Sequence, residues 1–384
     1  MQLSYWEHES FFKNIDVAVI GSGIVGLNAA WAIKKQTPHL NVAVLERSFL
    51  PYGASTRNAG FACFGSVSEL LDDLNSHSWD EVFALVEKRY KGLLRLRENL
   101  GDEAIDFHNW GGYEVFGEAD ESLFEACLNK LETFNSALLE ITGQAEVYKQ
   151  TDAKISQFGL HGITHLIENI AEGQIDTGKM MTSLLKKVRA SGVNIINGFP
   201  VDSVQEEGTQ ALIISGDQHI SVKNVLITTN AFAKELLPEA AVIPGRAQVL
   251  ITKPIPDLKI KGTFHYDKGY YYFRNINDRL LLGGGRNLDF KTEETTVFGL
   301  TEKVQRRLEL LLKENILPDQ PFEIDRRWSG IMGLGHSKRT IMQAVSENVF
   351  CAVRLGGMGV AIGSLIGEEA AEMVLQKVLD TSPH

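Results

Sequence analysis

The sequence predicts an α/β fold built on a doubly wound, Rossmann-like domain. Two observations predict it. Short β-branched runs typical of buried strands are each followed by a glycine-rich turn and a helical pattern, once near the start of the chain and once near its end. The 384 residues, 44% of them hydrophobic, suffice for a large core and for more than one domain.

The first βαβ unit lies at the start of the chain. Residues 15–20 form a β-branched run that ends in glycine, which indicates a buried strand. Residues 21–26 form a turn, residues 27–35 continue as a helix that stops near Pro38, and residues 41–46 are a second buried strand. Such units are right-handed, so these two strands are expected to be parallel.

The remaining elements follow from periodicity and turn signals. Helices are expected at 68–100, 121–139, 177–190, 301–314 and 362–378. Strands are expected at 112–116, 193–196, 225–229, 270–273, 280–282 and 349–353, and an antiparallel meander at 201–225 around a turn at 215–217. The chain contains no internal repeat and no low-complexity segment.

Charge and targeting signals exclude several classes of protein. With 38 Lys and Arg against 49 Asp and Glu, the net charge of −11 gives no attraction to nucleic acid. The N-terminus lacks the pattern of a signal peptide, and the uncharged stretch 17–33 is too short and too rich in glycine to span a membrane. We therefore expect a cytoplasmic protein without nucleic-acid or membrane partners.

Two smaller features have an ordinary structural interpretation. His161, His165 and Glu168 have the spacing of metal ligands on a helix, but residues 162–164 are poor helix formers, so no metal site is predicted. Cys63 could be a redox thiol, but its apolar neighbours favour a buried structural cysteine.

A dinucleotide-binding motif joins the first strand to the first helix. Gly21, Gly23 and Gly26 give the pattern GxGxxG, and Glu46 ends the next strand twenty residues after Gly26. In this context the glycines allow a tight turn and a close approach of the backbone, the helix N-terminus faces a pyrophosphate, and the acid accepts from a ribose hydroxyl. The alternative is a strand–helix turn that is merely rich in glycine. The motif alone does not separate NAD from FAD.

A second glycine-rich turn, at residues 356–359, accompanies the first, and together they make the chain resemble a known superfamily. This is the D-amino-acid oxidase, glycine oxidase and sarcosine oxidase superfamily of FAD-dependent amine oxidoreductases, and the resemblance runs over nearly the whole chain. Further matching segments are 54–60, 172–176, 200–201, 225–231 and 244–248, while 278–285 and 327–330 look most similar to the γ-glutamylputrescine oxidase branch.

The resemblance implies a discontinuous FAD-binding domain with an inserted α+β substrate domain. The expected boundaries are 1–88, 150–236 and 326–384 for the FAD-binding domain, and 89–149 and 237–325 for the substrate domain. The residues expected to bind FAD are Gly21, Gly23, Ile24, Val25, Gly26, Glu46, Arg47, Thr56, Arg57, Asn58, Ala59, Gly60, Val201, Arg354, Gly356, Gly357, Met358, Gly359 and Val360.

Three departures from the superfamily bear on its chemistry. Leu281 stands where sarcosine oxidases have a lysine that speeds reaction with oxygen. No cysteine stands at their flavin-linking position, near residues 328–329, so FAD is expected to be non-covalent. Ile331 and Met332 stand where glycine and D-amino-acid oxidases have the arginine that binds the substrate carboxylate.

The resemblance implies oxidation of the C–N bond of an amine or amino acid by hydride transfer to flavin N5. Tyr270 and Tyr272, on one face of an aromatic strand, are the candidates for lining the substrate cavity, and Arg274 and Arg286 (with Lys268) are the candidate cations there. The alternatives are an NAD-dependent dehydrogenase and a flavin-binding module with a structural or tRNA-associated role. The substrate, the electron acceptor and the oligomeric state are left open.

Overall fold

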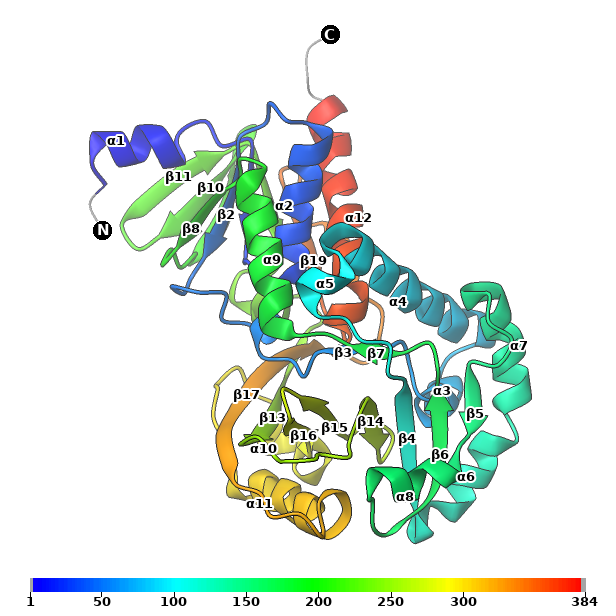
Figure 1. The fold of residues 1–384 in the computed structure, drawn as a ribbon. Coiled ribbons are helices and arrows are strands. Elements are labelled where there is room, and N and C mark those ends of the chain that lie inside the picture. The colour runs from blue at the N-terminus through cyan, green and yellow to red at the C-terminus, as the bar shows by residue number, and fades with distance from the viewer. Residues whose placement is uncertain (1–2, 381–384) are drawn as a thin grey trace.

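A six-stranded sheet forms one half of the molecule (Figure 1). The computed structural model describes residues 3–380. The strand order is β18 (Ile341–Ala344), β19 (Val349–Val353), β12 (Asn224–Ile227), β1 (Val17–Ile20), β2 (Val42–Glu46) and β8 (Asn194–Asn197). All neighbours are parallel except β18 and β19. The first strand therefore lies inside a largely parallel sheet, as the βαβ pattern predicts.

Alternation along the central strands buries both faces of this sheet. Val17 and Val19 of β1 point into the core formed with α2 (Ile24–Gln36), α4 (Trp79–Leu100), α9 (Thr177–Ala190) and α12 (Gly359–Asp380). Ala18 and Ile20 point to the opposite face, which is covered by the meander β9 (Ser203–Glu207), β10 (Gln210–Ser215) and β11 (Gln218–Val222). The second face of the sheet is thus covered by a small sheet, whereas a doubly wound fold commonly has helices on both faces.

Helices α2 and α12 pack tightly because glycines lie at their contact. A Cβ on Gly363 would lie 2.5 Å from the Ile24 side chain, and one on Gly367 would lie 2.8 Å from the Val25 carbonyl oxygen. Neither distance is compatible with a real side chain, so only glycine allows this approach. The packing brings the N-termini of the first and last helices of the domain to the same side of the molecule.

An eight-stranded sheet forms the other half (Figure 1). Its order is β17 (Ile324–Leu334), β13 (Ile243–Thr252), β16 (Arg279–Gly284), β15 (Tyr271–Ile276), β14 (Thr263–Tyr266), β4 (Gly112–Gly117), β6 (Ile163–Asn169) and β5 (Tyr148–Gln150). Helix α11 (Glu302–Leu311) packs on one face, with Val304 and Leu308 in a core shared with Phe264 and Phe273. Strands β6 and most of β17 belong to this sheet, although the predicted boundaries assign residues 150–236 and 326–384 to the FAD-binding part.

Two long predicted helices are each divided. The segment 68–100 forms α3 (Val67–Leu74) and α4, because Ser78 caps a new helix with Glu81 in a reciprocal capping box. The segment 121–139 forms α6 (Glu121–Leu128) and α7 (Leu131–Thr142). The shorter elements are α1 (Tyr5–Glu7), β3 (Phe61–Ala62), α5 (Asp102–Ile105), α8 (Ile155–Phe158), β7 (Gly173–Gln174) and α10 (Phe290–Glu293).

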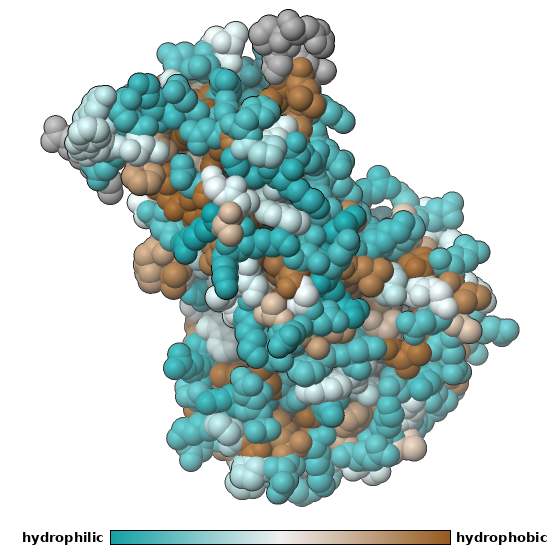
Figure 2. Space-filling view, turned by 45° about the horizontal axis from the view of Figure 1, so that its top comes forward, coloured by the Kyte–Doolittle hydropathy of each residue, from teal (hydrophilic) through white to brown (hydrophobic). Residues whose placement is uncertain are grey.

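The face of the molecule shown in Figure 2 is mostly hydrophilic, with apolar residues in small separate groups. Within residues 3–380, no helix combines the length and the apolar character that crossing a membrane requires.

Candidate active site

A cavity of about 530 Å³ lies where the two halves of the molecule meet. The carboxyl ends of β1 and β2 and the N-termini of α2 and α12 line one side, and the eight-stranded sheet lines the other. The volume falls in the range of roughly 300–1,000 Å³ that is usual for small-molecule sites. The crevice beyond the carboxyl ends of parallel strands is also where open α/β sheets bind ligands.

The GxGxxG turn is built around close backbone contacts. A Cβ on Gly26 would lie 2.1 Å from the carbonyl oxygen of Gly21, so glycine is required there for α2 to pack onto the turn. Glu46 is buried at the end of β2, and its Oε2 accepts from both the backbone N–H (3.1 Å) and the hydroxyl (2.6 Å) of Ser22. The carboxylate thus fixes the glycine turn while facing the cavity.

The loop after Pro51 closes over the start of α2. The Ser55 hydroxyl oxygen accepts from the backbone N–H of Ile24 at 2.9 Å. Arg57 donates to the carbonyl oxygen of Ser329 at 2.8 Å, and its guanidinium lies 4.0 Å from the ring of Tyr52 and 4.6 Å from that of Phe298. Planar guanidinium groups stack well on aromatic rings, so Arg57 is held rigidly in the cavity wall.

The second glycine-rich turn delivers the N-terminus of α12 to the same cavity. Gly356 and Gly357 have φ values of +60° and +83°, which glycine adopts without strain. The backbone N–H groups of Arg354 and Leu355 donate to Asn230 Oδ1 at 3.1 and 3.3 Å and so fix the turn. A helix N-terminus carries a partial positive charge, and two of them, from α2 and α12, face this one cavity.

These features fit a flavin dinucleotide. Two helix N-termini can stabilise negative charge, one at a pyrophosphate and one at a reduced ring system, and Glu46 can accept from a ribose hydroxyl. The chain was also compared with known families: residues 16–373 match the DAO model, described as FAD dependent oxidoreductase. The chain belongs to this family. The match confirms FAD as cofactor and an oxidoreductase activity, and it decides against the NAD-dependent alternative.

Similar proteins share the fold at low sequence identity. The probable oxidoreductase OrdL of Haemophilus influenzae is 20% identical over 377 residues, which cover 94% of this chain and 83% of that protein. L-proline dehydrogenase from P. horikoshii superposes with a TM-score of 0.74 at 19% identity, covering 95% of this chain and 94% of the other. Glycine oxidase from Bacillus cereus gives 0.74 at 14% identity, covering 95% and 98%. These structures confirm the α/β fold class.

Most residues predicted to bind FAD line the cavity. They are Gly21, Gly23, Ile24, Val25, Glu46, Arg47, Arg57, Asn58, Ala59, Gly60, Val201, Gly356, Gly357, Met358, Gly359 and Val360. Three others do not line it. Gly26 is packed beneath the turn, Thr56 donates to the carbonyl oxygen of Pro51, and Arg354 donates away from the cavity to the carbonyl oxygens of Arg339 and Ala241. Gly26 and Arg354 thus belong to the packing of the two glycine-rich turns, and Thr56 to that of the loop after Pro51.

The substrate side of the cavity is the part lined by the eight-stranded sheet and its loops. Tyr270 and Tyr272 line it, whereas Tyr271 points into the core on the other face of the sheet. Tyr272 lies across Gly283, where a Cβ would be 2.5 Å from its ring. Burial raises the pKa of the Tyr272 hydroxyl to about 12, so this group is neutral and can act as a hydrogen-bond donor.

Arg274 does not line the cavity, contrary to its selection as a substrate-side cation. Its side chain is buried, and Nη1 donates to the carbonyl oxygens of Gly60 (2.9 Å) and Ile175 (2.7 Å). Burial lowers its pKa to about 10, which leaves it charged at neutral pH. Arg274 therefore joins the flavin loop to the segment before α9. Residues 272 and 274 share a face of β15, but the guanidinium of Arg274 is turned to the backbone carbonyl groups of Gly60 and Ile175.

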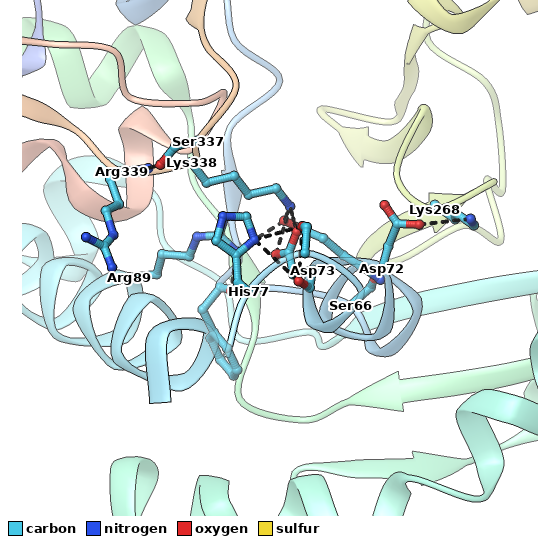
Figure 3. A network of polar contacts seen from close by, with 12 residues as sticks. Ser66, Asp72, Asp73, His77, Arg89, Lys268, Ser337, Lys338 and Arg339 are labelled. Atoms are coloured by element: carbon cyan, nitrogen blue, oxygen red, sulfur yellow. Dashed lines mark hydrogen bonds and ion pairs between the residues drawn. The ribbon is translucent and has the colours of Figure 1, made fainter. Parts of the chain in front are cut away.

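The cations near the substrate side are mostly paired (Figure 3). Lys268 donates to Asp72 at 3.0 Å, and Lys338 bridges Glu69 (2.9 Å) and Asp73 (2.7 Å), both on α3. Arg286 also lines the cavity but has no ion pair among the described residues; its guanidinium lies 4.7 Å from the ring of Phe290. Burial lowers the pKa of Arg286 as well.

Several cavity residues were missed by the sequence reasoning. Glu69, Asp72, His265 and Lys338 all line the cavity, but they lie on α3, on β14 and on the loop after β17, far apart in the chain. Only the pairing of β14 with β15 and the docking of α3 bring them together, and no local motif marks them. Cys63 lines the cavity too, and burial raises the pKa of its thiol, consistent with an unreactive structural cysteine.

The histidines at 161 and 165 do not form a metal site. His165 lies on β6, where it contacts Asp152 (3.0 Å) and Glu121 (3.2 Å), and His161 precedes the strand beside Asp319. Among residues 3–380, no group of three or more His, Cys, Asp or Glu side chains is arranged to hold a metal ion.

Proposed function

We propose that this chain oxidises the C–N bond of an amine whose carboxylate, where it has one, is remote from the reacting nitrogen. FAD, when bound, supplies a two-electron acceptor for the substrate C–H bond. The proposal rests on where the cations lie on the substrate side of the cavity. An α-carboxylate needs a fixed cation beside the reacting carbon, because burying its charge unpaired costs several kcal/mol.

The wall at that position is apolar. Ile331 and Met332 both line the cavity, on β17, and the Met332 sulfur lies close to the glycine-rich turn, 3.4 Å from where a Cβ of Gly357 would be. Leu281, in place of a lysine, is buried against Ala59 and Val249. The residues nearest this part of the wall thus provide van der Waals contact and exclude water. They supply no charge for an α-carboxylate.

Arg286 is the cation that supports a remote carboxylate. It lies beside Gly245 and stacks on Phe290, which is 45% exposed, so its charge lies toward the outer end of the cavity. Being unpaired among the described residues, its guanidinium is available for a bidentate contact with a carboxylate. The side chains of Tyr270 and Tyr272 lie on the same wall, and their hydroxyl groups can orient a chain between the two ends.

A variant of Arg286 tests the proposal. In Arg286→Leu we expect the KM for γ-glutamylputrescine to rise about 10–150-fold, the equivalent of one charge-assisted hydrogen bond of roughly 1.5–3 kcal/mol, with the KM for putrescine little changed. Arg306→Leu, an exposed arginine on α11, serves as the matched control. An equal effect of Arg286→Leu on both amines, or none on either, would refute the role of Arg286.

A further inference from the structure

A buried histidine and a buried glutamate meet behind the substrate side of the cavity. His265, on β14, lines the cavity with a side chain that is 12% exposed, and its ring is in edge contact with Phe61. Its Nε2 is buried and has no hydrogen-bond partner, and it lies 3.9 Å from Oε2 of Glu172, just before β7. A shift of about 1 Å would bring these two atoms to hydrogen-bonding distance.

The two ring nitrogens of His265 face different surroundings. Nε2 points toward Glu172, whereas Nδ1 has no hydrogen bond to any described residue and lies on the side of Gly269, which itself lines the cavity. A carboxylate at Glu172 favours a proton on Nε2, which leaves the lone pair of Nδ1 available to the cavity. The histidine therefore connects the cavity to the buried carboxyl group.

The two carboxylate oxygens of Glu172 differ in their hydrogen bonds. Its Oε1 accepts from the backbone N–H groups of Phe64 (2.8 Å) and Gly65 (3.1 Å), while Oε2 has no hydrogen-bond partner among the described residues. Both oxygens are packed closely, since a Cβ on Gly112 would lie 2.1 Å from Oε2. The free oxygen is thus the one that faces His265.

The charges around the pair leave Glu172 without a cation. Arg89 and Lys338 both contact Glu69, and although burial alone would raise the pKa of Glu69, these two cations lower it to about 2. The titratable groups around His265 and Glu172 are Glu69 on α3, Arg89 on α4, Glu114 on β4, Tyr148 on β5, Tyr272 on β15, Cys63 after β3 and Lys338 after β17. Glu69 pairs with both Arg89 and Lys338, and Lys338 also pairs with Asp73, so neither cation pairs with Glu172 or Glu114.

The pKa values of Glu172 and His265 agree with the absence of a cation beside Glu172. Burial raises the pKa of Glu172 to about 8, against the opposing effect of its two backbone hydrogen bonds. Burial also lowers the pKa of His265 to about 4, although the charge of Glu69 opposes this. At neutral pH the histidine is therefore neutral and Glu172 holds a proton, which it loses on mild alkalinisation.

We propose that His265 and Glu172 form a proton-transfer pair that accepts the ammonium proton of the bound amine. An N–H bond of the ammonium group breaks and an Nδ1–H bond forms; the Nε2–H bond breaks and an Oε2–H bond forms on the Glu172 carboxylate. The products are the neutral amine, neutral His265 and neutral Glu172, so charge and atoms balance. The neutral amine has the lone pair that C–N oxidation requires. This inference rests on the proposed function.

The first test measures anaerobic flavin reduction by a reactive amine as a function of pH. In the wild type we expect the rate constant to rise up to tenfold per pH unit and to level off near pH 8. In Glu172→Gln and in His265→Asn the change of slope near pH 8 should disappear, and the rate constant at pH 8 should fall at least tenfold. Glu114 is another buried glutamate without a cation partner among the described residues. Its variant Glu114→Gln is the matched control and should keep the change of slope. An unchanged profile in both variants, with wild-type reduction intact, would overturn the pair while leaving the proposed function standing.

The second test does not depend on activity. In holoprotein labelled with ¹³C at histidine Cε1, the His265 signal is assigned by its loss in His265→Asn. We expect this signal to keep the shift of a neutral ring down to pH 5 and to show a step near pH 8 that is absent in Glu172→Gln. A ring that becomes protonated between pH 6 and 7, or a step that persists in Glu172→Gln, would overturn the proposal. If no amine reduces the wild-type flavin, the proposed function fails, and the proton-transfer role fails with it even where the step is seen.

Discussion

Replacing Glu46 by alanine should weaken FAD binding by more than the loss of one contact. The carboxylate accepts from the N–H and the hydroxyl of Ser22, whose side chain is fully buried, and from the N–H of Ser48 at 3.1 Å. Alanine leaves the two buried Ser22 donors without an acceptor, at about 1–3 kcal/mol each, and removes a ribose contact of about 1.5–3 kcal/mol. The first effect loosens the glycine turn, and the second acts on FAD directly.

The assay is an equilibrium titration of the apoprotein with FAD, followed by flavin fluorescence. We expect the Kd of Glu46→Ala to rise about 10–150-fold from the ribose contact alone, since each 1.4 kcal/mol is roughly tenfold. Ser22→Ala removes only the hydroxyl donor and keeps the carboxylate, so its Kd should rise much less. A Kd of Glu46→Ala equal to that of the wild type would refute the assignment of Glu46, and equal losses in both variants would show that Glu46 acts only through the turn.

Three further predictions concern linkage of the cofactor, packing and pH. Acid denaturation of the holoprotein should release all flavin into the supernatant, because no cysteine lies at residues 328–329; colour in the precipitate would contradict this. Arg274→Met should lower the free energy of unfolding in urea by about 2–4 kcal/mol, since the carbonyl oxygens of Gly60 and Ile175 each lose a charged donor, although the Gly60 oxygen still accepts from the N–H of Ile175. The order of preferred amines should stay the same; an altered preference at unchanged stability would show that Arg274 acts on the substrate. The raised pKa of Glu172 means that the folded state binds more protons than the unfolded state between about pH 4.5 and 8, so stability falls as pH rises in that window; the advantage of Glu172→Gln over the wild type should grow by roughly 1 kcal/mol per pH unit there, and a constant difference would be inconsistent with a raised pKa.

Local patterns indicated which segments line the cofactor side of the cavity. The glycine turn at 21–26, Glu46 at the end of β2 and the turn at 356–359 are each written in consecutive residues, and parallel strands carry them to one edge of the sheet. Their neighbours Thr56 and Arg354 were placed in the site by the same segments, but their side chains turn toward other backbone groups. A segment fixes the path of the backbone more reliably than the direction of each side chain.

The substrate half was less accessible to sequence reasoning, because long-range docking assembles it. Tyr272 and Arg274 share a strand face, yet only Tyr272 reaches the cavity. His265 and Glu172 lie on segments separated by more than ninety residues, and neither is part of a motif. Helix periodicity likewise does not show that one helix ends at Leu74 and the next begins at Trp79; only the capping residues Ser78 and Glu81 mark this break.

The central claim is that the cavity binds FAD beside an amine whose carboxylate is remote or absent. The most direct measurement is the rate of anaerobic bleaching of the bound flavin by glycine, sarcosine, D-alanine, putrescine and γ-glutamylputrescine at fixed pH. We expect bleaching by putrescine or γ-glutamylputrescine and slow or no bleaching by the three small zwitterions, because Ile331 and Met332 provide no cation beside the reacting carbon. Rapid bleaching by glycine or D-alanine, or none by any amine, would contradict it.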